Sequence, residues 1–243
     1  MPKPALTETA LLALWERAVL LSPAAREREL ARCLAPDDTP ATLGAQRALL
    51  LQALALDLRQ RGDRLELTSH CPRCEQKVEF SADPAAMAAT QPAPGGEARL
   101  AGEGWSLRCR APTPDDLVAV ADQADAHACA ALLLKRCVPE AQSGGAAVAP
   151  ERLPAVALAA LERHLQAVDP LACVGFELDC PACAMHWMAP FDVAQALWGR
   201  VQIAAEQLFA QVDLLARRYG WREADVLSMP PQRRRAYLQL AGA

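Results

Sequence analysis

A chain of 243 residues can bury a sizeable core without a metal, and its formal net charge of −4 at pH 7 disfavours a nucleic-acid backbone as its partner. The composition is 52% hydrophobic but only 5% aromatic, which favours close-packed helices over an aromatic β-sandwich. Nine cysteines, an odd number without a secretion signal, disfavour a disulfide framework and indicate a reducing cytoplasm, so metal binding or buried thiols must account for them.

The N-terminal part of the chain is predicted to be helical. Glu8, Glu16 and Arg17 lie within the first apolar stretch, which therefore predicts a helix and not a signal peptide. Apolar spacing predicts two short helices within residues 7–32 and a third over residues 45–60. No apolar run in the sequence is long enough to span a bilayer, so we expect no membrane span.

The next part of the chain changes to period-two alternation. This pattern surrounds a Cys-Pro-x-Cys sequence at Cys71 and Cys74 and predicts a β-hairpin. Residues 84–104 are mainly Pro, Ala and Gly and predict a flexible loop. The stretch "WSLRCRAPT" predicts a strand, and a pair of helices is expected to follow it as far as Cys137.

The hairpin pattern then occurs a second time. Residues 139–150 predict another linker, and a helix bounded by prolines follows it. Aligning "LELTSHCPRCEQKVEFSAD" with "GFELDCPACAMHWMAPFD" shows an internal repeat, with Cys71 and Cys180 separated by 109 positions. A long helix over residues 191–219 and two short helices complete the chain.

The two cysteine pairs predict one shared metal site. Two thiols at a hairpin tip supply half of a tetrahedral zinc site, so two such tips complete it. We therefore predict that Zn²⁺ is bound by four thiolates, those of Cys71, Cys74, Cys180 and Cys183. A thiol oxidoreductase is a competing hypothesis, but strands follow both pairs where that chemistry requires a helix N-terminus. Buried free thiols are a third interpretation, which explains two matched pairs poorly.

Other candidate residues are weaker. His70 and His186 flank the pairs and could replace a thiolate, although a position beside the sulfurs or at the surface is favoured. The remaining cysteines are interpreted as buried small hydrophobic residues: Cys33, Cys109, Cys129, Cys137 and Cys173. The run Arg233, Arg234 and Arg235 could contact phosphate, but a solvated helix face is the simpler interpretation. No motif predicts a catalytic residue or a small-molecule substrate, so we do not expect an enzyme.

Together these patterns predict a mainly α protein with a small β zinc-ribbon-like module formed by the two Cys-Pro-x-Cys hairpins. We expect four divisions. They are an N-terminal helical segment (1–62), a module of paired zinc-knuckle hairpins (63–83 with 171–190), a helical insertion (105–170) and a C-terminal part with a long helix and a helical tail (191–243). A zinc-ribbon module that binds nucleic acid or associates with transcription is the alternative function.

Several segments also suggest a family: "LLALWERA", both "CPxC" sequences, "RAPTPDDL", "LLLKRCV", "FDVAQALW" and the ending "LARRYGWREADVLSMPPQRRRAYLQL". In these segments the chain resembles proteins encoded with contractile phage tails and phage-tail-like injection particles, related to T4-type baseplate hub assembly proteins. The resemblance implies a non-enzymatic structural component or assembly factor of a baseplate, with other baseplate or tail proteins as partners. It implies a location in the cytoplasm or in an assembled tail particle, and it carries over only the same four cysteines as site residues.

Overall fold

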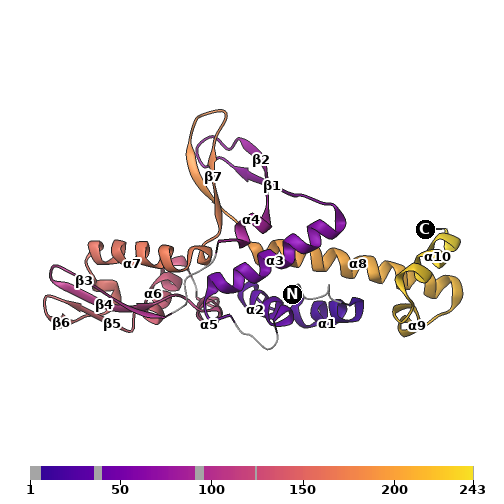
Figure 1. Ribbon diagram of the computed structural model, residues 1–243, viewed down its shortest axis with the longest axis horizontal. Coiled ribbons are helices and arrows are strands. Elements are labelled where there is room, and N and C mark those ends of the chain that lie inside the picture. The colour runs from indigo at the N-terminus through magenta and orange to yellow at the C-terminus, as the bar shows by residue number, and fades with distance from the viewer. Residues whose placement is uncertain (1–6, 36–39, 91–95, 124, 243) are drawn as a thin grey trace. The chain divides into compact units, whose positions relative to one another are not determined.

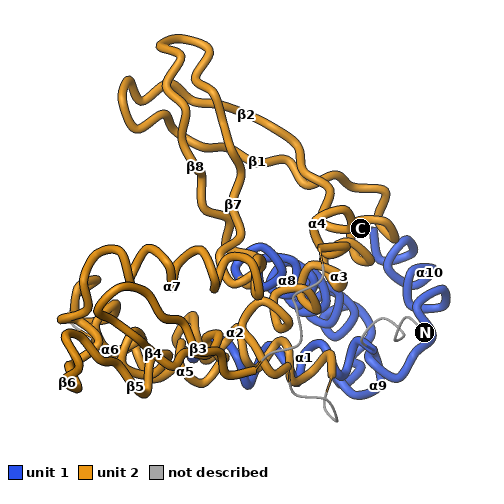
Figure 2. Tube along the Cα trace, turned by 60° about the vertical axis from the view of Figure 1, so that its left-hand side comes forward, with its two compact units in different colours: residues 1–21, 195–243 blue, residues 22–194 orange. Residues whose placement is uncertain are grey.

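The computed structural model describes residues 7–35, 40–90, 96–123 and 125–242. The chain is 57% helical, and the described strands form three small antiparallel sheets, so the fold class is mixed α/β. The chain divides into two compact units, one formed by residues 1–21 with 195–243 and the other by residues 22–194 (Figure 2). Among the described helices, none combines the length and the apolar character needed to cross a bilayer.

Helices make up much of the unit formed by residues 22–194. In chain order they are α2 Pro23–Leu34, α3 Leu43–Arg61, α4 Pro84–Ala88, α5 Pro114–Val120, α6 Ala126–Cys137 and α7 Ala155–Val168, with 3-10 turns η1 Pro150–Arg152 and η2 Pro170–Ala172. The helix α3 begins at Thr42, whose hydroxyl oxygen accepts a hydrogen bond from the Ala45 N–H at 3.2 Å. It ends at Gly62, whose φ of 72° lies in the left-handed region that glycine adopts readily, and the helix predicted over residues 45–60 is confirmed.

A four-stranded antiparallel sheet packs against α7 in the same unit (Figure 1). Its strands are adjacent in chain order: β3 Glu97–Gly102, β4 Trp105–Arg110, β5 Glu140–Ser143 and β6 Ala146–Ala147. Alternate residues of β4 are buried, and Leu107 joins Ala157 and Leu161 of α7 in one apolar core. The strand predicted from "WSLRCRAPT" is confirmed in β4.

Two segments that were expected to be loops contain secondary structure. Residues 84–104 include α4 and β3, and residues 139–150 include β5 and β6. The strands were not expected because Ala and Gly have weak strand propensity, whereas pairing within the four-stranded sheet and packing of this sheet against α7 decide the conformation. Ala98 and Leu100 pack against the sheet core, and this period-two pattern was the signal in the sequence.

The two Cys-Pro-x-Cys sequences each form a two-stranded hairpin, as predicted. The first pairs β1 Leu65–His70 with β2 Lys77–Ala82, and the second pairs β7 Gly175–Asp179 with β8 His186–Pro190. The hairpins lie side by side in both views (Figures 1 and 2). Phe80 of β2 meets Phe176 of β7 edge-on, with ring centroids 5.1 Å apart, so the hairpins also pack through aromatic side chains.

The other unit is helical in its described residues. It contains α1 Glu8–Ala18, most of α8 Val193–Tyr219, α9 Glu223–Leu227 and α10 Pro231–Ala241. Leu12 of α1 packs against Ala205 and Leu208 of α8, which gives this unit its own apolar core. The long helix expected over residues 191–219 is confirmed as α8.

Candidate metal centre

Each Cys-Pro-x-Cys sequence folds into the same turn. In the first, the Cys71 N–H donates to the Gln76 carbonyl at 3.0 Å, and the Glu75 N–H donates to the Cys71 carbonyl at 2.9 Å. Cys180 and Ala184 make the two equivalent donations in the second turn, both at 2.9 Å. The residue after the second cysteine has a positive φ in both turns, 59° at Glu75 and 54° at Ala184. The internal repeat in the sequence is therefore also a repeat of backbone geometry.

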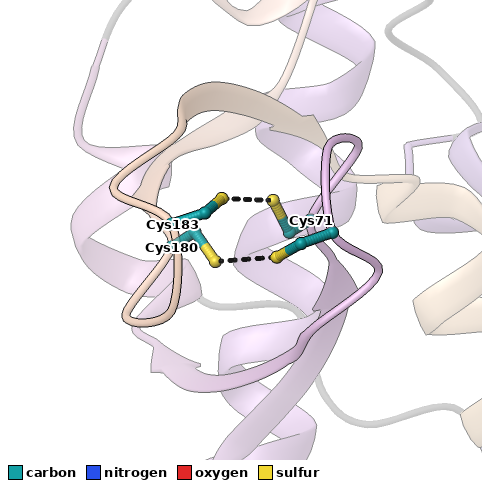
Figure 3. Close-up of side chains that lie close together, drawn as sticks. Cys71, Cys180 and Cys183 are labelled. Atoms are coloured by element: carbon teal, nitrogen blue, oxygen red, sulfur yellow. Dashed lines mark hydrogen bonds between the residues drawn. The ribbon is translucent and has the colours of Figure 1, made fainter.

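The four predicted ligands converge. The sulfur atoms of Cys71, Cys74, Cys180 and Cys183 all lie within 4.8 Å of one another. The Cys71 and Cys183 sulfurs are 3.6 Å apart, and those of Cys74 and Cys180 are 3.5 Å apart. Both short contacts join one hairpin to the other (Figure 3). None of the four is in a disulfide.

Backbone N–H groups and neighbouring thiols shift the pKa values of the thiols in this cluster. Burial raises the pKa of the Cys71 thiol, but several donors, among them the Arg73 N–H at 3.4 Å from its sulfur, outweigh burial and lower that pKa to about 6. The Gln76 N–H lowers the pKa of Cys74, whereas the thiols around it, first that of Cys183, raise it to about 12. A metal ion that binds the four sulfurs would replace the protons of these thiols.

The flanking histidines do not join this group. His186 Nδ1 lies 3.1 Å from Asp179 Oδ1, and the His186 side chain is 61% exposed. Neither His186 nor His70 belongs to the ligand group found among the described residues. The contact of Asp179 with His186 was not predicted from the sequence. Asp179 occupies the position in the second repeat that His70 occupies in the first.

The other five cysteines differ in their exposure. Cys109 and Cys137 are buried, as expected, and burial raises the pKa of the Cys137 thiol to about 11. Cys33 and Cys129 are half-buried. Cys173 is exposed, so its interpretation as a buried hydrophobic residue was wrong. It lies in the short connection between η2 and β7.

The arginine run near the C-terminus is not a uniform basic face. Arg234 is 3% exposed and donates hydrogen bonds to the Glu8 carboxylate and to the Val226 carbonyl. Arg233 and Arg235 are exposed. The interpretation as a solvated helix face therefore holds for Arg233 and Arg235 but is wrong for Arg234.

A surface recess of about 520 Å³ lies between α3 and the base of the first hairpin. It is lined by charged and apolar side chains, and no cysteine or histidine contributes to it. The recess is therefore separate from the cysteine cluster in its chemistry.

No protein-family model, curated protein or solved structure matches this chain. What the cluster can do follows from its own ligands: four cysteine sulfurs this close together could hold one metal ion.

Proposed function

We propose that the four cysteines bind one structural zinc ion. Zinc–sulfur bonds of about 2.3 Å in a tetrahedron place the sulfurs roughly 3.8 Å apart. The two contacts between hairpins, 3.5 and 3.6 Å, are close to that spacing. The convergence of these thiols from two distant repeats is the observation that carries the proposal. Four thiolates leave no open coordination position, so the role of the ion is structural.

Beyond the aromatic contact of Phe80 with Phe176, the hairpin strands bury little apolar surface that could stabilise them. Within strands β1, β2, β7 and β8, Ala189 alone is buried, while the other apolar side chains stay half-buried or exposed. At the tips, Cys71 and Cys180 are 1% and 3% exposed. Small modules with so little apolar burial commonly need a metal or disulfides. A bound zinc ion would supply this stability and would tie together two segments that are far apart in the chain.

We further infer that this zinc-tied chain is a non-enzymatic structural component or assembly factor of a contractile tail baseplate. Support comes from the resemblance of its sequence segments to proteins of contractile tails. A structural metal site fits such a role because it rigidifies a surface without supplying chemistry. The expected partners are other baseplate or tail proteins.

The alternative, a zinc-ribbon module that binds nucleic acid, gains no support from charge. Residues 63–83 and 171–190 contain three Lys and Arg residues against seven Asp and Glu residues. A surface that holds a phosphate backbone normally has the opposite balance. The burial of Arg234 removes one of the basic side chains that this alternative would use.

Metal analysis of the purified protein tests the zinc site. We expect one zinc per chain by elemental analysis, and we expect Cys→Ser at each of the four positions to lower zinc content and thermal stability together. Cys173→Ser is the matched control, because this thiol is exposed and outside the cluster, and it should leave both unchanged. Iron in place of zinc, no metal, or full zinc content in Cys180→Ser would contradict the proposal.

A binding experiment tests the baseplate role. The purified protein is mixed with each purified tube, sheath, spike and baseplate protein encoded beside its own gene, and complexes are sought by size-exclusion chromatography. We expect a stable complex with at least one of them. An inert monomer would count against the role, and salt-dependent DNA or RNA binding that weakens in Arg233→Ala and Arg235→Ala would favour the alternative.

A further inference from the structure

A buried carboxylate joins two segments that are far apart in the sequence. Asp169 is 2% exposed, and its Oδ2 accepts a hydrogen bond from the Gly44 N–H at 3.0 Å. Its Oδ1 accepts another from the Thr42 hydroxyl at 3.2 Å. Thr42 and Gly44 form the N-terminal end of α3, where helical N–H groups lack partners and the helix dipole is positive. Asp169 therefore acts as a second cap for α3, supplied from 125 residues away along the chain.

A second contact holds the same two segments together. Arg47, in the second turn of α3, donates to the carbonyl oxygen of Ala172 in η2 and pairs with Glu27 of α2 at 3.1 Å. The N-terminal end of α3 is thus held to η2 and the residue before it by two contacts, one made by the Asp169 carboxylate and one by the Arg47 guanidinium. Burial raises the pKa of the Asp169 carboxyl, and the Gly44 and Thr42 donors only partly offset this effect, so the carboxylate depends on keeping both partners.

The contact also requires a glycine. A Cβ atom at position 44 would lie 1.9 Å from Asp169 Oδ1 and 3.0 Å from the Ala172 backbone nitrogen. A larger side chain therefore displaces the Asp169 carboxylate from this position or moves η2 away from α3. The sequence thus supplies both halves of a specific contact: a position without a side chain and a carboxylate that fills the space.

This contact lies at the base of the second hairpin, and the first hairpin follows the opposite end of the same helix, α3. The chain leaves α3 at Arg61 and enters β1 at Leu65, and it leaves η2 at Ala172 and enters β7 at Gly175. Holding α3 to η2 therefore fixes the starting points of the two hairpins relative to each other. The hairpins then need only short spans of chain to bring their thiols together.

We propose that Asp169, with Gly44 as its partner, is a positioning residue for the four-cysteine site and brings the two pairs of thiols together before metal binds. The inference rests on the proposed zinc site and deepens it. Cys74 and Cys180 are separated by 106 residues. Once the Asp169 contact and α3 have formed, the flexible parts of the path between the two pairs are residues 62–74 and 173–180, joined by the rigid helix. This shorter path raises the effective concentration of one pair near the other about fourfold.

Two variants and two measurements test this role. Asp169→Asn removes the charge while keeping the shape, and Gly44→Ala blocks the approach of the carboxylate. In both, we expect zinc affinity, measured by competition with a chromophoric chelator, to fall about fourfold or more. In the metal-free protein, we expect the disulfide between Cys74 and Cys180, formed with diamide and located by peptide mass spectrometry, to form at least fourfold more slowly.

Matched controls separate positioning from general loss of stability. Asp116→Asn alters another fully buried carboxylate in the same unit that contacts neither hairpin, and it should lower thermal stability while leaving zinc affinity and disulfide rate unchanged. Gly199→Ala adds a Cβ with no atom within 4 Å and should alter neither measurement.

Each outcome then decides the inference. Wild-type zinc affinity and disulfide rate in Asp169→Asn would overturn it, as would equal losses in Asp116→Asn. If the unaltered protein binds no zinc, the proposed function fails, and the disulfide rate still decides whether Asp169 positions the thiols. If Gly44→Ala does not fold, Asp169→Asn decides alone.

Discussion

Glu75 and Ala184 are the two described non-glycine residues with a positive φ, 59° and 54°, and they hold equivalent positions in the two cysteine turns. A side chain in this left-handed region costs about 1 kcal/mol relative to glycine. We therefore predict that Ala184→Gly raises the free energy of unfolding of the metal-loaded protein by about 0.5 kcal/mol, measured by urea denaturation. Ala182→Gly, two positions earlier and without a positive φ, should lower it slightly. Equal effects of the two changes would show that backbone strain at position 184 is unimportant.

Asp116 is a second residue with a defined energetic role. It is fully buried, accepts hydrogen bonds from Arg110 and from Arg136 at 2.7 Å, and completes a capping box with Thr113. Burial alone would raise the pKa of this carboxyl, but the two guanidinium groups and Thr113 outweigh burial and hold the pKa well below its usual range.

The pH dependence of this contribution follows from the direction of the shift. A carboxyl whose pKa is lower in the folded state than in the unfolded state stabilises the fold above about pH 4 and loses that effect as the pH falls further. We predict that Asp116→Asn lowers the free energy of unfolding by about 2 kcal/mol at pH 7 and by clearly less at pH 3, measured by urea denaturation at both pH values. Asp115→Asn is the control, because its side chain is 73% exposed and should contribute little. If Asp116→Asn lowered the free energy of unfolding equally at pH 7 and pH 3, the lowered pKa of Asp116 would be contradicted.

At the scale of elements, local signals in the sequence predicted those parts that local interactions determine. Apolar periodicity was enough to place α3. The strands β3, β5 and β6 were missed because their short sequences contain few residues of high strand propensity and become strands by pairing within the four-stranded sheet, which packs against α7.

The packing of α7 on this sheet gives a further prediction. Leu161 is 5% exposed in the core between the helix and the sheet. We predict that Leu161→Ala lowers the free energy of unfolding of the unit by about 3 kcal/mol, because it removes buried methyl groups and leaves a cavity. Val156→Ala on the same helix, where the side chain is 60% exposed, should change it by less than about 0.5 kcal/mol. Chemical denaturation followed by circular dichroism measures both changes, and similar losses would mean that α7 does not pack as described.

At the scale of the whole molecule, long-range contacts could be predicted only where the sequence repeats. The two matching Cys-Pro-x-Cys hairpins indicated that Cys71 and Cys180 meet, since each offers half of one tetrahedral site. The contact of Asp169 with Gly44 has no counterpart elsewhere in the sequence, and its residue types occur on many surfaces. Such contacts depend on how helices pack, which local patterns do not specify.

The pairing of Arg234 with Glu8 is a further long-range contact, 226 positions apart, within the unit formed by the two ends of the chain. Arg234 is nearly fully buried, and losing it leaves the Val226 carbonyl and the Glu8 carboxylate without this donor. We predict that Arg234→Ala destabilises this unit by about 2–3 kcal/mol, seen as faster hydrogen exchange in α1 and α10. Arg233→Ala and Arg235→Ala should leave exchange unchanged, because both side chains are exposed. If all three variants showed the same hydrogen exchange, Arg234 would be a surface residue. If the prediction holds, any loss of nucleic-acid binding in Arg234→Ala would result from unfolding of this unit. Phosphate contact would then have to be tested with Arg233→Ala and Arg235→Ala.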